Sequence, residues 1–174
     1  MNEEVSNNIL NNFRFKYGAL ISHFGFTQVP NFLVKNRKLL GIGRSEMDLV
    51  CALLSYEFDG ATSCPSLSGI SKRNGIAYAT IWSAKKKLEK KGYLRVKIGN
   101  EKYLSGPYRN NQYDLSGLRR KLREIARVKL QEQFFDKKIS NADYERLINT
   151  DAHEKHIFED IFKSDIASYI EIKD

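Results

Sequence analysis

Two sets of residues in this chain have types and spacings that suggest chemistry, and both fall short of a site. His153 and His156 lie three residues apart with Asp151 and Asp160 nearby, which would place metal-binding side chains on one helix face. Structural metal sites usually need four strong ligands in a rigid cage, so we expect no metal here. Gly41-Ile42-Gly43 lacks the third glycine and the preceding strand of a dinucleotide-binding loop. We therefore expect no nucleotide cofactor.

Catalysis and redox chemistry are also not indicated. The chain has nine tyrosines, but a DNA-nicking site needs its tyrosine beside a metal-binding histidine cluster, and no His-x-His pair occurs. No GxxxxGK[ST] phosphate loop is present. Cys51 and Cys64 are too few for a disulfide framework and form no CxxC pair, so we expect two reduced thiols. The sequence predicts a protein that is not an enzyme and needs no cofactor.

The remaining chemical signal is positive charge, which is concentrated before residue 136. The chain carries a net charge of +8, with 23 basic and 11 acidic residues up to Phe135 and 6 basic and 10 acidic after it. Five lysines fall in one run: Lys85, Lys86, Lys87, Lys90 and Lys91. A surplus of this kind attracts polyanions, chiefly nucleic acid, although a charge run on its own also fits a solvated face.

Length and composition define the broad class. A chain of 174 residues with 41 % hydrophobic side chains is long enough for one globular domain, or for one domain with an appendage, that buries a core. No stretch of about 18 apolar residues occurs, and the first ten residues are polar and acidic. We expect no membrane span and no signal peptide, and hence a cytoplasmic protein.

The N-terminal part predicts an arm, an extended step and a buried helix. Residues 1–24 read as a loose arm on which we place no structure. The Val29-Pro30 step favours an extended backbone before a short helix. Ser45 and Asp48 form a capping-box-like start for a buried helix that we expect to continue to Phe58.

Two helices joined by a tight turn are predicted next. Ser66 is a suitable N-cap for a short helix over residues 67–73, and Asn74-Gly75 ends it because glycine adopts the left-handed conformation. The second helix, residues 78–91, has lysines on one side, and Gly92 stops it. Its apolar face repeats at helical spacing: Ile81, Ala84 and Leu88.

Two short strands and a helical extension complete the pattern. Residues 93–98 alternate between apolar and basic, as in a half-buried strand, and a polar loop joins them to a return strand over residues 111–115. Residues 116–135 predict one long helix. The acidic remainder is predicted to be helical in two pieces, residues 141–149 and 153–163.

The segment that carries the lysine run resembles a known DNA-binding motif. PSLSGISKRNGIAYATIWSAKKKLEKKGYL, residues 65–94, is similar to the winged helix-turn-helix of bacterial regulators and of plasmid and phage replication initiators or organisers. Thr80 followed by Ile81, Leu88 seven residues on, and Gly92 match the motif. Ala77 departs from it, because the family often has serine there, so we expect a weak N-cap and the loss of one phosphate contact.

The resemblance implies a fold and a domain order. The fold class is mostly α with a small β-hairpin wing, that is, a winged helix-turn-helix domain over residues 25–115, followed by a helical extension over residues 116–174. Residues 25–33, GFTQVPNFL, are similar to the segment before this domain in mobile-element replication proteins. This second similarity favours a plasmid, phage or conjugative element as the setting.

The resemblance and helix geometry together suggest residues that contact DNA. The second helix would enter the major groove, where its first residues reach base edges and its later lysines meet phosphates. Trp82 either touches the DNA backbone or packs against the arm, and Arg109 suits a narrow minor groove. The candidates are Ser66, Ser68, Lys72, Tyr78, Ala79, Thr80, Trp82, Ser83, Lys86, Lys87, Lys97, Asn100, Lys102 and Arg109.

The function expected from these residues is sequence-specific binding of double-stranded DNA. We expect the protein to mark a replication origin or a conjugative transfer origin, as an accessory of replication or of the relaxosome, and to recruit a partner protein through its C-terminal helices. A transcriptional repressor is the first alternative, and an interaction adaptor without DNA binding is the second. The stripe of Leu115, Leu118, Leu122 and Ile125 predicts either a homodimer seam or packing on its own domain.

Overall fold

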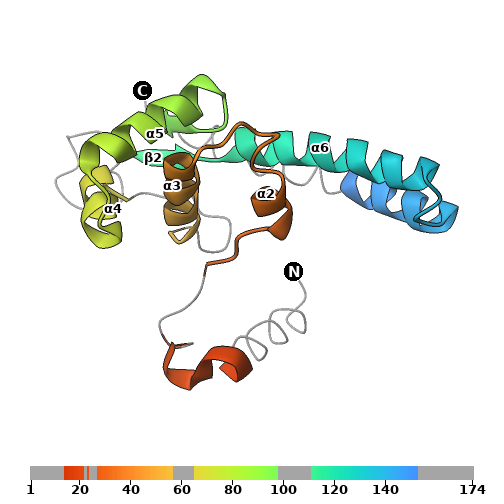
Figure 1. The fold of residues 1–174 in the computed structure, drawn as a ribbon, viewed down its shortest axis with the longest axis horizontal. Coiled ribbons are helices and arrows are strands. Elements are labelled where there is room, and N and C mark those ends of the chain that lie inside the picture. The colour runs from red at the N-terminus through yellow and green to blue at the C-terminus, as the bar shows by residue number, and fades with distance from the viewer. Residues whose placement is uncertain (1–13, 22, 24–26, 57–64, 98–110, 153–174) are drawn as a thin grey trace, which may run out of the picture. The chain divides into compact units, whose positions relative to one another are not determined.

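The computed structural model describes residues 14–21, 23, 27–56, 65–97 and 111–152, and it divides the chain into two units, Met1–Lys121 and Leu122–Asp174. Figure 1 shows the elements in order along the chain. They are α2 (Asn31–Lys35), α3 (Arg44–Leu54), α4 (Leu67–Asn74), α5 (Tyr78–Lys90), β1 (Arg95–Lys97), β2 (Gln112–Asp114) and α6 (Ser116–Phe135).

The expected loose arm is wrong for one stretch, because residues 14–21 are helical. Lys16, Ala19 and Leu20, which lie within this stretch, are good helix formers. The helix does not bury its apolar side chains: Phe15 is 93 % exposed. Amphipathic patterning was too weak here to reveal the helix.

The start and end of α3 both differ from expectation. Its N-cap is Gly43, whose backbone N–H donates to Oε2 of Glu46 at 2.7 Å, so Ser45 and Asp48 do not cap it. Glutamate at the third helical position reaches back to this N–H, as in a capping box. The helix ends at Leu54 rather than Phe58, with Ser55 as its C-cap.

The link from α4 to α5 follows the sequence prediction closely. Ser66 caps α4, its Oγ accepting from the Gly69 N–H at 3.0 Å, and Gly75 ends it in the left-handed conformation with φ of 63°. Ser71 then closes the turn by donating from its Oγ to the Ile76 carbonyl at 2.6 Å. Ala77 provides no side-chain cap for α5, so the prediction of a weak N-cap is confirmed.

The core of the first unit lies where α5 packs on α3 and α4. The predicted apolar face of α5 is fully buried there, together with Leu49, Leu53 and Ile70 from the other two helices. Gly92, with φ of 68°, ends the helix, and the Tyr93 N–H returns to the Leu88 carbonyl at 3.0 Å. This arrangement holds α5 at the surface of the unit with its opposite side outward (Figure 1).

The wing is a two-stranded antiparallel hairpin that is shorter than predicted. Val96 of β1 pairs with Tyr113 of β2, and Tyr113 is buried. Tyr93 and Leu94 lie outside β1, because they form the exit from α5 and Leu94 is already part of the core. The loop that joins the strands, residues 98–110, lies outside the described residues.

The first turn of α6 is built into the same unit. The Leu118 N–H donates to the Tyr93 carbonyl at 3.2 Å, and Gly117 lies directly against the backbone of Gly92. Leu115, which precedes the helix, and Leu118 are both buried in this core. Leu115 and Leu118 of the predicted stripe therefore pack within their own domain. The other two residues of the stripe, Leu122 and Ile125, are half-buried and lie in the second unit.

The second unit contains the rest of α6 and a helix over residues 141–152. Phe134 and Tyr144 stack with ring centroids 4.5 Å apart, and Arg127 forms an ion pair with Asp151 at 2.6 Å. These contacts tie the two helices into a hairpin. The helix extends beyond the predicted residue 149, and the predicted helix over residues 153–163 lies outside the described residues.

A helix, a short helix, a glycine turn, a surface helix and a two-stranded hairpin, in this order, form a winged helix-turn-helix. The predicted fold class, mostly α with a small hairpin wing and a helical extension, is confirmed. In this fold α5 corresponds to the helix that enters the major groove, and we call it the recognition helix.

Candidate nucleic-acid interface

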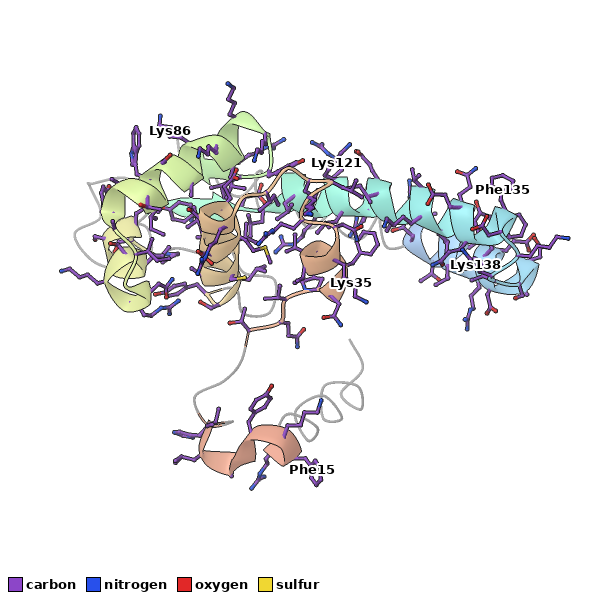
Figure 2. The ribbon with its side chains drawn as sticks, viewed as in Figure 1. Phe15, Lys35, Lys86, Lys121, Phe135 and Lys138 are labelled. Atoms are coloured by element: carbon purple, nitrogen blue, oxygen red, sulfur yellow. The ribbon has the colours of Figure 1, made fainter. Side chains whose placement is uncertain are left out.

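The recognition helix α5 presents one outward stripe to solvent. Helical periodicity places Ala79, Ser83, Lys86 and Lys90 opposite the buried face, and all four are exposed. Lys86, labelled in Figure 2, projects from α5 on the side away from α3 and α4. A helix mounted in this way offers its outer side to the groove of a duplex without disturbing its own packing.

The two sides of this stripe differ. Tyr78 and Trp82 are four residues apart on one side, 52 % and 48 % exposed. Trp82 is not packed in a core: the Lys86 Nζ lies 5.1 Å from its ring centroid. Thr80 and Lys87 are seven apart on the other side, which faces α3, and Thr80 is half-buried. Thr80 thus lies beside the outward stripe and not on it, whereas the sequence analysis grouped Thr80 with Ala79 among the residues that reach base edges.

The five lysines of the run have different roles. Lys85 pairs with Glu89 at 3.4 Å, four residues on, and Lys91 pairs with the nearly buried Glu46 of α3. Lys86, Lys87 and Lys90 form no ion pair with any described residue, and all three are exposed. Within this run, the charge available to a polyanion therefore comes from these three.

Lys90 is a candidate that sequence reasoning missed. It belongs to the outward stripe because it lies eleven residues after Ala79 and four after Lys86. The sequence alone could have predicted the exposed position of Lys90, since the apolar face of the helix already determines which side points outward.

The three candidates on α4 are exposed at the two ends of that short helix. Ser66 and Ser68 lie at its start with their hydroxyls 3.3 Å apart, and Lys72 lies near its end. The prediction that Ser66 caps the helix is confirmed. Its contact with a phosphate stays a prediction.

The wing candidates are only partly described. Lys97 is exposed at the end of β1 and pairs in register with Gln112. Asn100, Lys102 and Arg109 lie outside the described residues, so the expected minor-groove contact of Arg109 stays a prediction.

Three further features of the part of the chain that the structure describes bear on other chemistry. Burial, and then the charge of Asp48, raise the pKa of the free thiol of Cys51, which disfavours the reactive thiolate. No group of three or more His, Cys, Asp or Glu side chains is placed to hold a metal ion among these residues, and His153 and His156 fall outside them. No described helix combines the length and apolar character needed to cross a bilayer.

The chain was compared with known proteins. No protein-family model and no curated protein matches it. Among solved structures, it is similar to a MarR-family transcriptional regulator from Silicibacter pomeroyi, with 14 % identity, a TM-score of 0.37, and coverage of 71 % of this chain and 77 % of that one.

Two further solved structures are similar. One is a MarR/EmrR-family transcriptional regulator from Acinetobacter sp. ADP1, with 18 % identity, a TM-score of 0.37, and coverage of 92 % of this chain and 99 % of that one. The other is a mutant of S. aureus MepR bound to an oligodeoxyribonucleotide, with 17 % identity, a TM-score of 0.38, and coverage of 87 % and 97 %. Because these sequence identities and TM-scores are low, the fold class is assigned from the order and contacts of the chain's own helices and strands.

Proposed function

We propose that this protein binds a specific sequence of double-stranded DNA by placing α5 in the major groove. The observation that carries the proposal is the outward stripe of α5, which is exposed along the whole helix while its opposite face forms the core. A helix of about 10–12 Å diameter fits a major groove about 12 Å wide. The stripe is thus the part of the domain suited to reading a duplex.

The residues of the stripe have different proposed roles. Ala79 and Ser83, in the first half of α5, contact base edges, the alanine methyl against a thymine methyl and the serine hydroxyl as donor or acceptor. Lys86 and Lys90 add the charge that neutralises phosphates. Trp82 and Tyr78, on the side of α5 away from α3, rest on sugar and phosphate.

Transcriptional repression is the output that we propose. A repressor needs only to occupy its site and exclude other proteins, which the recognition surface achieves without any further contact. Origin or transfer-origin marking is the second candidate, supported by the similarity of residues 25–33 to mobile-element replication proteins. That output also requires a replication or transfer protein held by the C-terminal helices.

Sequencing of DNA captured from the source cell tests both outputs. Genomic fragments are bound at about 150 mM salt, where counterion-driven non-specific binding is weak. Enrichment at promoters supports repression, and enrichment of a repeated locus within a mobile element supports origin marking. A Lys86→Glu, Lys87→Glu variant is the control, since it must lose the enrichment. Equal capture by this variant, or no enriched locus, would indicate the interaction adaptor instead.

We also propose that the protein acts as a homodimer through its second unit. Val128 and Phe135 of α6 lie seven residues apart on one face and are 55 % and 71 % exposed, so they offer apolar surface that a second copy would cover. Two such domains would read two half-sites about one DNA turn apart. Light scattering after size exclusion should give twice the chain mass for the protein, and the single mass for a Val128→Glu, Phe135→Glu variant. A strict monomer, both free and on DNA, contradicts the dimer.

A further inference from the structure

An open hollow lies between the first turn of α3 and the side of α5 that faces it. Both helices belong to the first unit and pack directly on each other. The polar side chains that line the hollow are Arg44, Ser45 and Glu46 from α3, and Thr80, Ser83 and Lys87 from α5. Residues 34 or more positions apart in the sequence therefore share one surface beside the recognition helix.

The electrostatic balance of the hollow is positive. Its one carboxylate, Glu46, already accepts from the Lys91 ammonium through Oε1 and from the Gly43 N–H through Oε2. Arg44 and Lys87 are exposed and form no ion pair with a described residue. Two cationic residues from two helices thus line a space in which the one carboxylate among the described lining residues is neutralised.

The place of the hollow relative to α5 identifies its ligand. A helix inserted in the major groove nearly fills its width, so the sides of that helix meet the sugar-phosphate strands that border the groove. Thr80 and Lys87 form one of these sides. Arg44 of α3 lines the same hollow, and a guanidinium binds phosphate through two parallel N–H donors.

We propose that this hollow holds one backbone phosphate of duplex DNA, with Arg44 and Lys87 as its cationic contacts and Thr80 as a hydroxyl donor. The inference rests on the proposed function and deepens it, because it assigns a DNA contact to α3. Thr80 then contacts the backbone and carries no sequence information.

The first test measures the affinity of the full chain for its selected DNA as a function of salt. Arg44→Gln should weaken binding about tenfold, as expected for one charged hydrogen bond. It should also reduce the slope of log K against log salt by about 0.9, the share of one phosphate contact. Lys35→Gln is the matched control, since Lys35 is an exposed cation on α2 that does not line the hollow, and it should change neither quantity (Figure 2).

The second test locates the phosphate. Each backbone phosphate of the selected site is replaced, one at a time, by an uncharged methylphosphonate. The unmodified protein should lose affinity when one particular phosphate on the strand beside α3 is replaced. Replacement of that same phosphate should not weaken the binding of Arg44→Gln any further. An additive loss at every position overturns the proposal.

The two proposals fail in distinguishable ways. If Arg44→Gln keeps full affinity and slope while Lys86→Gln weakens binding, only the phosphate site is wrong. If the unmodified chain selects no DNA at all, the proposed function is wrong, and this inference falls with it. Circular dichroism of each variant confirms that the exposed substitutions leave the fold unchanged.

Discussion

Lys91, at the C-terminal end of α5, places its Nζ 2.5 Å from Oε1 of Glu46 in the first turn of α3. The same ammonium donates to the Gly41 carbonyl, and the second oxygen of Glu46 accepts from the Gly43 N–H. Glu46 is nearly buried. One carboxylate thus caps α3 and fixes the end of the recognition helix against it.

Removal of this carboxylate charge should destabilise the domain. We expect Glu46→Gln to lower the free energy of unfolding by about 1–3 kcal/mol, the usual worth of a hydrogen bond to a charged group. Glu89→Gln is the control, because it breaks only the pair with Lys85, in which the carboxylate is more exposed than that of Glu46, and it should cost about 0.3–0.5 kcal/mol. Urea unfolding measures both, and equal losses would contradict a structural role for Glu46.

The same contact predicts a dependence on pH. Burial opposes ionisation of Glu46, but the hydrogen bonds from Lys91 and Gly43 outweigh it and hold its pKa below the ordinary value of 4.5. The unfolded chain then binds more protons, so the stabilisation is complete above pH 4.5 and is lost as pH falls through the pKa of the folded state. The difference in stability between the unmodified protein and Glu46→Gln should shrink below pH 4.5. A difference that stays constant to pH 3 would contradict this.

The contact between Gly117 and Gly92 should tolerate no side chain. A Cβ on Gly117 would lie 1.9 Å from the Gly92 carbonyl oxygen and 3.0 Å from its carbonyl carbon, and both of these Gly92 atoms belong to the backbone. Gly117→Ala should therefore cost about 3 kcal/mol, although alanine favours a helix. Arg120→Ala, at an exposed position of the same helix, should stay within about 0.5 kcal/mol. Thermal unfolding measures both variants, and equal losses of stability in Gly117→Ala and Arg120→Ala would contradict this steric clash.

The Ser66 cap and its predicted phosphate contact can be separated. Ser66→Ala should lower stability by about 1 kcal/mol because the Gly69 N–H loses its acceptor. Ser68→Ala, two residues on, should not. If Ser66 also contacts a phosphate, Ser66→Ala should weaken DNA binding after correction for folding. Unchanged stability in Ser66→Ala would show that water replaces the cap.

Local patterns predicted the helix-turn-helix well. Ser66, Gly75 and Gly92 fix the ends of α4 and α5 through short-range geometry, and the Ile81, Ala84 and Leu88 repeat fixes the buried side of α5. These signals depend on neighbouring residues alone, so a sequence contains them in full. The outward stripe follows from the same periodicity, and with it Lys90.

Contacts between distant residues account for what was missed. Glu46 looked like one acidic residue in a helix, because its partner Lys91 is 45 residues away. Arg44 gave no signal for the same reason, since its place beside Lys87 arises only when α3 packs on α5. Leu115 and Leu118 have the spacing of a dimer seam, and only the docking of the first turn of α6 shows that they belong to the core.

The most direct test of the account separates sequence preference from affinity along α5. Binding sites are selected from random duplexes with the unmodified protein, Ser83→Ala and Lys86→Gln. We expect the unmodified protein to select one motif and Ser83→Ala to relax it at one base pair, by about 1 kcal/mol, the usual worth of one hydrogen bond. Lys86→Gln should keep the motif, weaken binding to all sequences alike and lower the salt slope by about 0.9. Selection of no motif, or of the same motif with equal strength by all three proteins, would contradict DNA reading by α5.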